Sequence, residues 1–148
     1  MTTLDSVSLR RFVYTELVVG GVPPKAADIG DRFGVSEQEV KTALASLKIG
    51  KTIYVSPRSG EISMCGPFSA VPTAYRVSRG DTDWYANCAW DMLGIPFVIG
   101  QDVQIETSCG DCGEPIAMRA GATREPTVEA VVHFLVPARE WYKDLEFT

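Results

Sequence analysis

Apolar residues in the N-terminal third of the chain recur at the spacing of helices. In "SVSLRRFVYTELVV" they stand three and four residues apart, which predicts a helix over residues 6–19. The sequence "GGVPP" breaks this helix, and a second helix is expected over residues 26–33. Ser36 and Glu39 have the spacing of a capping box, so "VSEQEVKTALASL" predicts a third helix that begins after Ser36.

The helices are followed by a segment in which apolar and polar residues alternate. "KTIYVSPRSGEISMCGPFS" has the pattern of a β-hairpin, with "PRSG" as its turn. A helix-turn-helix followed by a hairpin is the arrangement of a winged helix. We therefore expect residues 1–80 to form a winged-helix-like unit, with "AVPTAYRVSRGD" as an extended connector at its end.

The second half of the chain predicts a small β-rich unit. "WYANCAWDMLGIPFVIG" is expected to form a buried helix, capped by Asp81 or Thr82 and ended by Gly94 and Pro96, that runs into a strand. Three segments have strand patterns: "FVIGQDVQIET", "EPIAMRAG" and "EAVVHFLVP". "AREWYKDL" predicts one or two helical turns. The fold class is thus α+β, with residues 81–148 forming a small mixed β-sheet unit with short helices, on which the N-terminal unit packs.

Composition and charge restrict the function classes. The chain has 148 residues, of which 45% are hydrophobic, so it has enough apolar side chains for a core. No apolar run has the length of a membrane span and the N-terminus lacks a signal-peptide pattern, so we expect a cytoplasmic protein without a membrane partner. Residues 1–80 carry ten basic and seven acidic side chains, whereas residues 81–148 carry four and twelve. The expected recognition helix opens with Glu37 and Glu39, which disfavours binding to nucleic acid.

Cys88 and Asp91 are the first candidates for chemistry. They stand three residues apart and would share one face of the expected helix. Apolar surroundings disturb the ionisation of both groups, a thiolate is the preferred ligand of a soft metal, and a protonated carboxyl is a proton donor. The structural alternative is a small buried thiol beside a carboxyl that forms hydrogen bonds within the fold.

Cys109 and Cys112 form a Cys-x-x-Cys pair in "CGDCG". One such pair is not enough to predict zinc, so three interpretations stay open: a turn with two thiols, a redox-active dithiol, or capture of a soft metal. His133 is the only histidine and is expected in a strand. Four aromatic residues are expected in the core or in pocket walls: Trp84, Trp90, Phe97 and Phe134.

Three stretches resemble the alkylmercury (organomercurial) lyase family. The strongest is "YANCAWDMLGIPFVIG", where the family has Tyr-Ala-x-Cys-Ala-x-Asp-x-Leu-x-x-Pro-x-x-Ile-Gly. The matching residues are Tyr85, Ala86, Cys88, Ala89, Asp91, Leu93, Pro96, Ile99 and Gly100. "TSCGDCGEPI" is similar to a segment in which the family has a Cys and a Gly-x-Pro turn, and "VHFLVPAREW" resembles its His-Phe stretch before a late Trp.

This resemblance implies protonolysis of carbon–mercury bonds, with Cys88 as the mercury-binding thiolate and Asp91 as the proton carrier. It implies no organic cofactor, an organometallic substrate, and removal of the mercury product by an external thiol or a mercury-accepting protein. The chain departs from the family at the second mercury-binding cysteine, whose position here holds Glu129. Because a carboxylate is a hard ligand, Cys109 and Cys112 become candidates for the missing soft ligand beside Cys88.

Two alternatives from other classes remain. The chain could be a non-catalytic protein that holds a soft metal or a thiol-reactive ligand. It could also be a winged-helix DNA-binding metal sensor.

Overall fold

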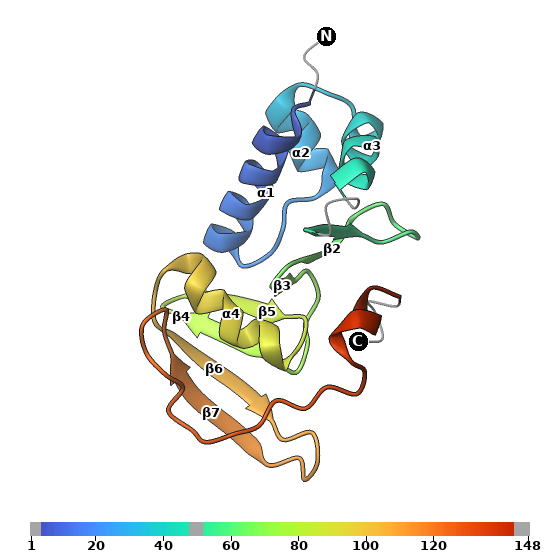
Figure 1. The fold of residues 1–148 in the computed structure, drawn as a ribbon. Helices are drawn as coiled ribbons and strands as arrows, with labels where there is room; N and C mark the ends of the chain where they lie inside the picture. The colour runs from blue at the N-terminus through green and yellow to red at the C-terminus, as the bar shows by residue number, and fades with distance from the viewer. Residues whose placement is uncertain (1–3, 48–51, 144–148) are drawn as a thin grey trace.

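The structure of the protein is a computed structural model, which describes residues 4–47 and 52–143 (Figure 1). In these residues the chain forms four α-helices, one 3₁₀-helix and seven strands of a single sheet. Helices α1–α3 lie together at one end of the molecule, and α4 packs on the sheet below them (Figure 1). The predicted α+β class is therefore confirmed. None of the helices in the described residues is long and apolar enough to cross a membrane.

The three N-terminal helices begin and end where the sequence predicts. Their bounds are α1 (Ser6–Gly20), α2 (Ala26–Phe33) and α3 (Glu37–Leu47). The predicted capping box is present, because the Ser36 N–H donates to Glu39 Oε2 at 2.8 Å and the Glu39 N–H donates to Ser36 Oγ at 3.3 Å. Gly34 follows α2 with φ of 67°, a left-handed conformation that glycine adopts without steric cost.

The sheet has the order β1-β2-β3-β5-β4-β6-β7. Its strands are β1 (Ile53–Val55), β2 (Ile62–Cys65), β3 (Phe68–Ser69), β4 (Arg76–Arg79), β5 (Thr82–Ala86), β6 (Val103–Ser108) and β7 (Pro115–Ala120). The predicted hairpin is β1–β2; Lys51, the first residue of the predicted segment, lies outside the described residues. All neighbouring strands are antiparallel, so the predicted mixed sheet is wrong. Short turns join most sequential strands, and such turns permit only antiparallel pairing.

The helix that carries Asp91 begins later than predicted. Residues 82–86 form strand β5 rather than a helix start, and α4 spans Ala89–Ile99 with Cys88 as its N-cap residue. Gly94 and Pro96 do not end α4, which continues to Ile99 and is followed by Gly100 in the left-handed conformation. An apolar run does not by itself distinguish a strand from a helix, and pairing of β5 with β3 and β4 decides the outcome.

The predicted strand over "EAVVHFLVP" is absent, and residues 129–137 have no regular secondary structure. The segment instead leaves β7 and leads to the 3₁₀-helix η2 (Ala138–Lys143), which covers the described part of the predicted C-terminal helical turns (Figure 1). Residues 144 and 145 of that prediction lie outside the described residues. Val131 is 93% exposed, so the alternating pattern does not correspond to a buried face here.

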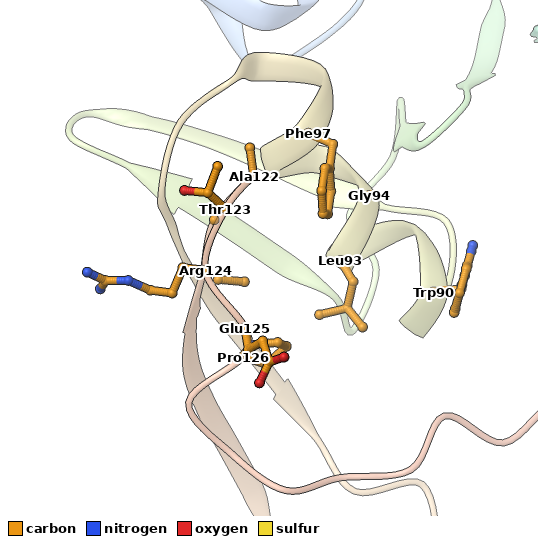
Figure 2. A pocket seen from close by; sticks show the side chains of 11 residues that line it. Trp90, Leu93, Gly94, Phe97, Ala122, Thr123, Arg124, Glu125 and Pro126 are labelled. Carbon is orange, nitrogen blue, oxygen red and sulfur yellow. The ribbon is translucent and has the colours of Figure 1, made fainter.

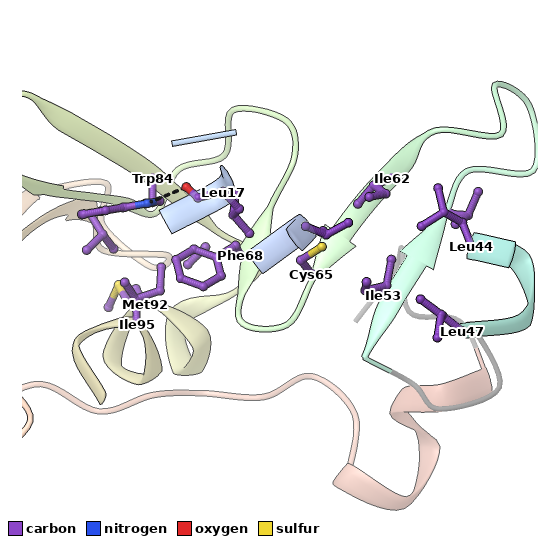
Figure 3. Packing of buried hydrophobic residues seen from close by; sticks show 14 of the residues in the cluster. Leu17, Leu44, Leu47, Ile53, Ile62, Cys65, Phe68, Trp84, Met92 and Ile95 are labelled. Atoms are coloured by element: carbon purple, nitrogen blue, oxygen red, sulfur yellow. Dashed lines mark hydrogen bonds between the residues drawn. The ribbon is translucent and has the colours of Figure 1, made fainter. Parts of the chain in front are cut away.

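One hydrophobic core extends from the helices through the sheet to α4 (Figure 3). Members of this core from different elements are Leu17, Leu44, Ile53, Phe68, Trp84 and Ile95. Trp84 Nε1 donates to the carbonyl oxygen of Leu17 at 3.1 Å, which links β5 to α1 inside the core. The boundary expected at residue 80 falls in the turn between β4 and β5, which are neighbours in the sheet.

Candidate active site

The structure brings Cys88 and Asp91 together at the point where β5 passes into α4. The Ala86 N–H donates to the Tyr75 carbonyl at 2.9 Å, and Thr73 Oγ1 donates to the Ala86 carbonyl at 2.7 Å, so the end of β5 is fixed. Cys88 then takes an extended conformation as the N-cap residue, and Asp91 lies in the first turn of α4. The predicted spacing therefore places the two side chains side by side at the start of the helix.

Both groups are half-buried, and burial raises the pKa of each. For Cys88 the first backbone N–H groups of α4 partly offset this rise, whereas the negative charge of Asp91 and a hydrogen bond from the thiol to its carboxylate add to it. For Asp91 the hydrogen bonds from Asn87 and Cys88 partly offset the rise. The Cys88 thiol therefore donates a hydrogen bond to the Asp91 carboxylate in surroundings that disfavour charge on both groups.

Asn87 is a site residue that the sequence analysis missed. Its Nδ2 donates to Asp91 Oδ2 at 3.2 Å, so the amide holds the carboxyl in place four residues further along the chain. Its Oδ1 is buried and has no hydrogen-bond partner in the described residues, an arrangement that costs free energy. The only signal in the sequence was the polar side chain between two small residues in an apolar stretch.

A pocket of about 510 Å³ lies on the outer face of α4 (Figure 2). Trp90, Leu93 and Phe97 form one wall, and residues 120–126 form the other. The side chain of Arg124 points away from the helix (Figure 2). Cys88 and Asp91 do not line this pocket, so it is separate from the thiol–carboxyl pair. Trp90, which lies between these two residues in the sequence, does line it.

Phe134 reaches the start of α4 from the C-terminal segment. Its ring centroid lies 6.4 Å from that of Trp90 and 4.9 Å from that of Trp141. Trp141 Nε1 donates to the Val136 carbonyl at 2.9 Å, which fixes the turn that follows Phe134. Trp90 is 59% exposed and Trp84 is buried, so of the aromatic residues predicted for core or pocket, Trp84 belongs to the core.

The CGDC turn, residues 109–112, connects β6 and β7. The Cys109 N–H donates to the Glu114 carbonyl at 2.8 Å and the Gly113 N–H donates to the Cys109 carbonyl at 2.9 Å. Backbone N–H groups of Cys112 and Asp111, and then the Cys112 thiol, lower the pKa of Cys109. Cys112 is exposed, and Cys65, Cys88, Cys109 and Cys112 are all unpaired thiols.

Glu129, the predicted replacement ligand, does not join the pair, and neither does the single histidine of the chain. Glu129 and His133 are exposed on the segment after β7, and neither forms a hydrogen bond or ion pair with Cys88 or Asp91. Within residues 4–47 and 52–143, no group of three or more His, Cys, Asp or Glu side chains is arranged to hold a metal ion. The thiols of Cys88, Cys109 and Cys112 are therefore not assembled into one three-ligand site.

The α+β fold and the contact between Cys88 and Asp91 agree with the protein family that the sequence motifs resemble. Residues 68–148 match the model of the alkylmercury lyase (MerB) family, and the chain belongs to this family. The family resemblance predicted from the sequence is confirmed.

Individual relatives agree with this assignment. Alkylmercury lyases of Bacillus cereus and Clostridium butyricum are each 28% identical over 125 residues, which cover 82% of this chain and 55% of the relative. The alkylmercury lyase of Staphylococcus epidermidis is 29% identical over 125 residues. The chain thus spans about half the length of the curated relatives it matches. The crystal structure of the mercury-bound form of MerB2 has a similar fold, with a TM-score of 0.62 and 21% identity over 84% of this chain and 60% of that chain.

Proposed function

We propose that the protein cleaves carbon–mercury bonds of organomercurials by protonolysis, with Cys88 as the mercury ligand and Asp91 as the proton carrier. The observation that carries the proposal is the contact of the Cys88 thiol with a half-buried carboxyl whose pKa is raised. Membership of the alkylmercury lyase family supports it. The proposal includes no organic cofactor.

The proposed reaction has two steps. The Cys88 thiol transfers its proton to the Asp91 carboxylate while the sulfur bonds to mercury and displaces its exchangeable anion. The protonated carboxyl then delivers that proton to the carbon atom, the carbon–mercury bond breaks, and hydrocarbon and Cys88-bound mercury(II) are formed. Burial favours the second step, because the raised pKa of Asp91 allows the carboxyl to stay protonated until carbon accepts the proton.

A second soft ligand would weaken the bond between mercury and carbon. Glu129 supplies only hard oxygen atoms, so we propose that the CGDC turn contributes the additional sulfur, which makes Cys88, Cys109 and Cys112 the metal ligands. An external thiol or a mercury-accepting protein would complete removal of the product. We also propose a cytoplasmic location, since four unpaired thiols suit a reducing compartment.

The test is incubation with phenylmercuric acetate and excess thiol, with benzene measured by gas chromatography. We expect benzene release that Cys88→Ser abolishes and Asp91→Asn strongly slows. Asp81→Asn is the matched control, because it removes the same charge from an exposed carboxyl at the turn before β5. Unchanged release by Asp91→Asn would contradict the assigned role of that carboxyl. Replacement of Glu129 by cysteine should increase the rate if a missing thiolate limits the reaction.

A binding function without catalysis is the second candidate, and the hard ligand at Glu129 is the observation that favours it. Tight binding of one mercury ion per chain without any benzene release would support this candidate and refute the lyase.

We further propose that residues 1–80 form a winged-helix-like scaffold and that residues 81–148 form the metal-binding unit. α2, α3 and the β1–β2 hairpin follow each other in the order of a winged helix. Lys41 Nζ lies 2.6 Å from Glu37 Oε1 and 3.9 Å from Glu61 Oε1, so its charge is already paired. A scaffold role agrees with this pairing better than a DNA-binding sensor, which needs unpaired cations for phosphates. Salt-sensitive binding to duplex DNA would refute the scaffold role.

A further inference from the structure

The CGDC turn holds two thiols in contact with each other and with solvent. Hydrogen bonds between Cys109 and Glu114 and between Gly113 and Cys109 close the turn, and the Cys112 thiol donates to the Cys109 sulfur. Cys112 is exposed and Cys109 is half-exposed. Cys65, by contrast, is 1% exposed and lies in the core, so it is not available to a ligand.

Two adjacent sulfur donors without further ligands favour a soft metal ion that needs only two ligands. No third His, Cys, Asp or Glu joins them into a metal-binding group in the described part of the chain. Zinc requires about four ligands in a structural site, so the turn by itself does not satisfy it. Mercury(II) is soft and prefers thiolates, and two sulfur atoms suffice for its linear coordination.

Strand register places this turn at the same end of the sheet as Cys88. Tyr85 of β5 and Glu106 of β6 both pair with Arg76 of β4, so these two residues are level in the sheet. Cys88 and Cys109 each follow three residues later. Since neighbouring strands lie about 4.8 Å apart, the axes of β5 and β6 are roughly 10 Å apart. The segments that carry Cys88 and Cys109 therefore leave the sheet at the same end of their strands.

We propose that Cys109 and Cys112 form a two-thiol site that accepts inorganic mercury(II) from Cys88. This inference rests on the proposed function and deepens it, because it assigns the destination of the product. Mercury bound to Cys88 and an external anion exchanges onto the thiolate of Cys109 and the sulfur of Cys112. The Cys112 thiol proton passes to the Cys88 sulfur, and the external anion leaves. The exchange regenerates the Cys88 thiol for another substrate.

The experiment uses the reduced 148-residue protein with one equivalent of mercuric chloride. Free thiols are then alkylated with iodoacetamide and located by peptide mass spectrometry. We expect mercury to protect Cys109 and Cys112 while Cys88 is alkylated. Protection of Cys88 with free thiols in the turn would overturn the proposal.

Variants in the turn provide a second measurement, retention of mercury against competing glutathione. Cys109→Ser and Cys112→Ser should each lower retention by at least about tenfold, because the second sulfur of the pair binds intramolecularly. Asp111→Asn is the matched control, since it changes the same exposed turn and keeps both thiols. Equal retention by all three variants would overturn the proposal, and circular dichroism establishes that each is folded.

These outcomes are independent of catalysis, because the probe is inorganic mercury. Benzene release with no mercury at the turn would leave the proposed roles of Cys88 and Asp91 intact and refute the acceptor. Mercury at the turn without benzene release would refute the lyase and retain a two-thiol binding site.

Discussion

Replacement of Trp84 by phenylalanine tests whether β5 is anchored to α1 through the core. Trp84 is 4% exposed, and its Nε1 donates to the Leu17 carbonyl at 3.1 Å in buried surroundings (Figure 3). Phenylalanine keeps an aromatic ring, but it removes the donor and leaves space where the second ring lay. Cys88 follows four residues after Trp84, so the anchor also supports the start of the candidate site.

The expected cost follows from these two losses. A buried hydrogen bond contributes about 1 kcal/mol, and the Leu17 carbonyl keeps the Gly21 N–H at 2.9 Å, so this acceptor is not left unpaired. Loss of the second ring adds roughly 1–2 kcal/mol, since complete removal of a buried aromatic side chain costs about 3–5 kcal/mol. Trp84→Phe should therefore lower the free energy of unfolding by about 2–3 kcal/mol, equivalent to roughly 4–12 °C in Tm.

The assay is urea unfolding followed by far-ultraviolet circular dichroism, because tryptophan fluorescence changes with the substitution itself. Trp90→Phe is the matched control: Trp90 is largely exposed, and its substitution should cost at most about 0.5 kcal/mol. Equal losses for Trp84→Phe and Trp90→Phe would refute the reasoning, and so would a Trp84→Phe loss below about 0.5 kcal/mol.

Three further predictions concern the backbone, the candidate site and the C-terminal segment. Gly21→Ala should destabilise the protein more than Gly80→Ala: both glycines have positive φ, but a Cβ at Gly21 would lie 2.3 Å from the Asp83 carbonyl oxygen, whereas Gly80 faces open space. Thermal unfolding of both variants compares the losses, and equal Tm values would contradict this explanation. Burial raises the pKa of Asp91 above its ordinary value of 3.8, so the folded protein binds the carboxyl proton more tightly than the unfolded chain does. The free energy of unfolding therefore falls as the pH rises above that ordinary value. Asp91→Asn should reduce this slope in urea unfolding measured as the pH is raised from about 4, and an unchanged slope would exclude Asp91 as its source. Phe134→Ala removes both aromatic contacts of its segment and should accelerate limited proteolysis after residue 127, whereas an unchanged cleavage rate would show that these contacts do not hold the segment.

The N-terminal helices were predictable because their signals are local. Ser36 and Glu39 satisfy backbone donors within one turn, and Gly34 adopts the left-handed conformation at the end of α2. Such signals act within four residues and do not depend on distant partners. The hairpin β1–β2 has the same property, since alternation and a short turn specify it.

Elements that depend on distant partners were not predictable. The aromatic residues of β5 are compatible with a helix or a strand, and their pairing with Arg76 and Val77 decides in favour of the strand. The apolar residues of 129–137 alternate as in a strand, yet Phe134 packs against Trp90 and Trp141 instead. Contacts between residues that are far apart in the sequence determine the conformation of both segments, and the pattern of apolar residues along the chain does not reveal these contacts.

The contact between Cys88 and Asp91 was predicted although the limits of their helix were not. An N-cap residue lies one turn before the third helical residue, so the spacing brings the two side chains together in either case. Trp90 and Phe97 line the pocket, which agrees with their predicted place in the core or in pocket walls. Asn87 and the second wall of the pocket were missed, because one requires the exact start of α4 and the other requires residues 120–126 against that helix.

Because Cys88 is the N-cap residue of α4, its sulfur can be replaced without loss of the fold. Serine is among the most favourable N-cap residues, and its oxygen accepts a hydrogen bond from the first turn more strongly than sulfur does. Exchange of this one atom in Cys88→Ser would thus remove the sulfur and give a protein at least as stable as the original. A loss of mercury binding in Cys88→Ser would therefore report on the sulfur rather than on the stability of α4.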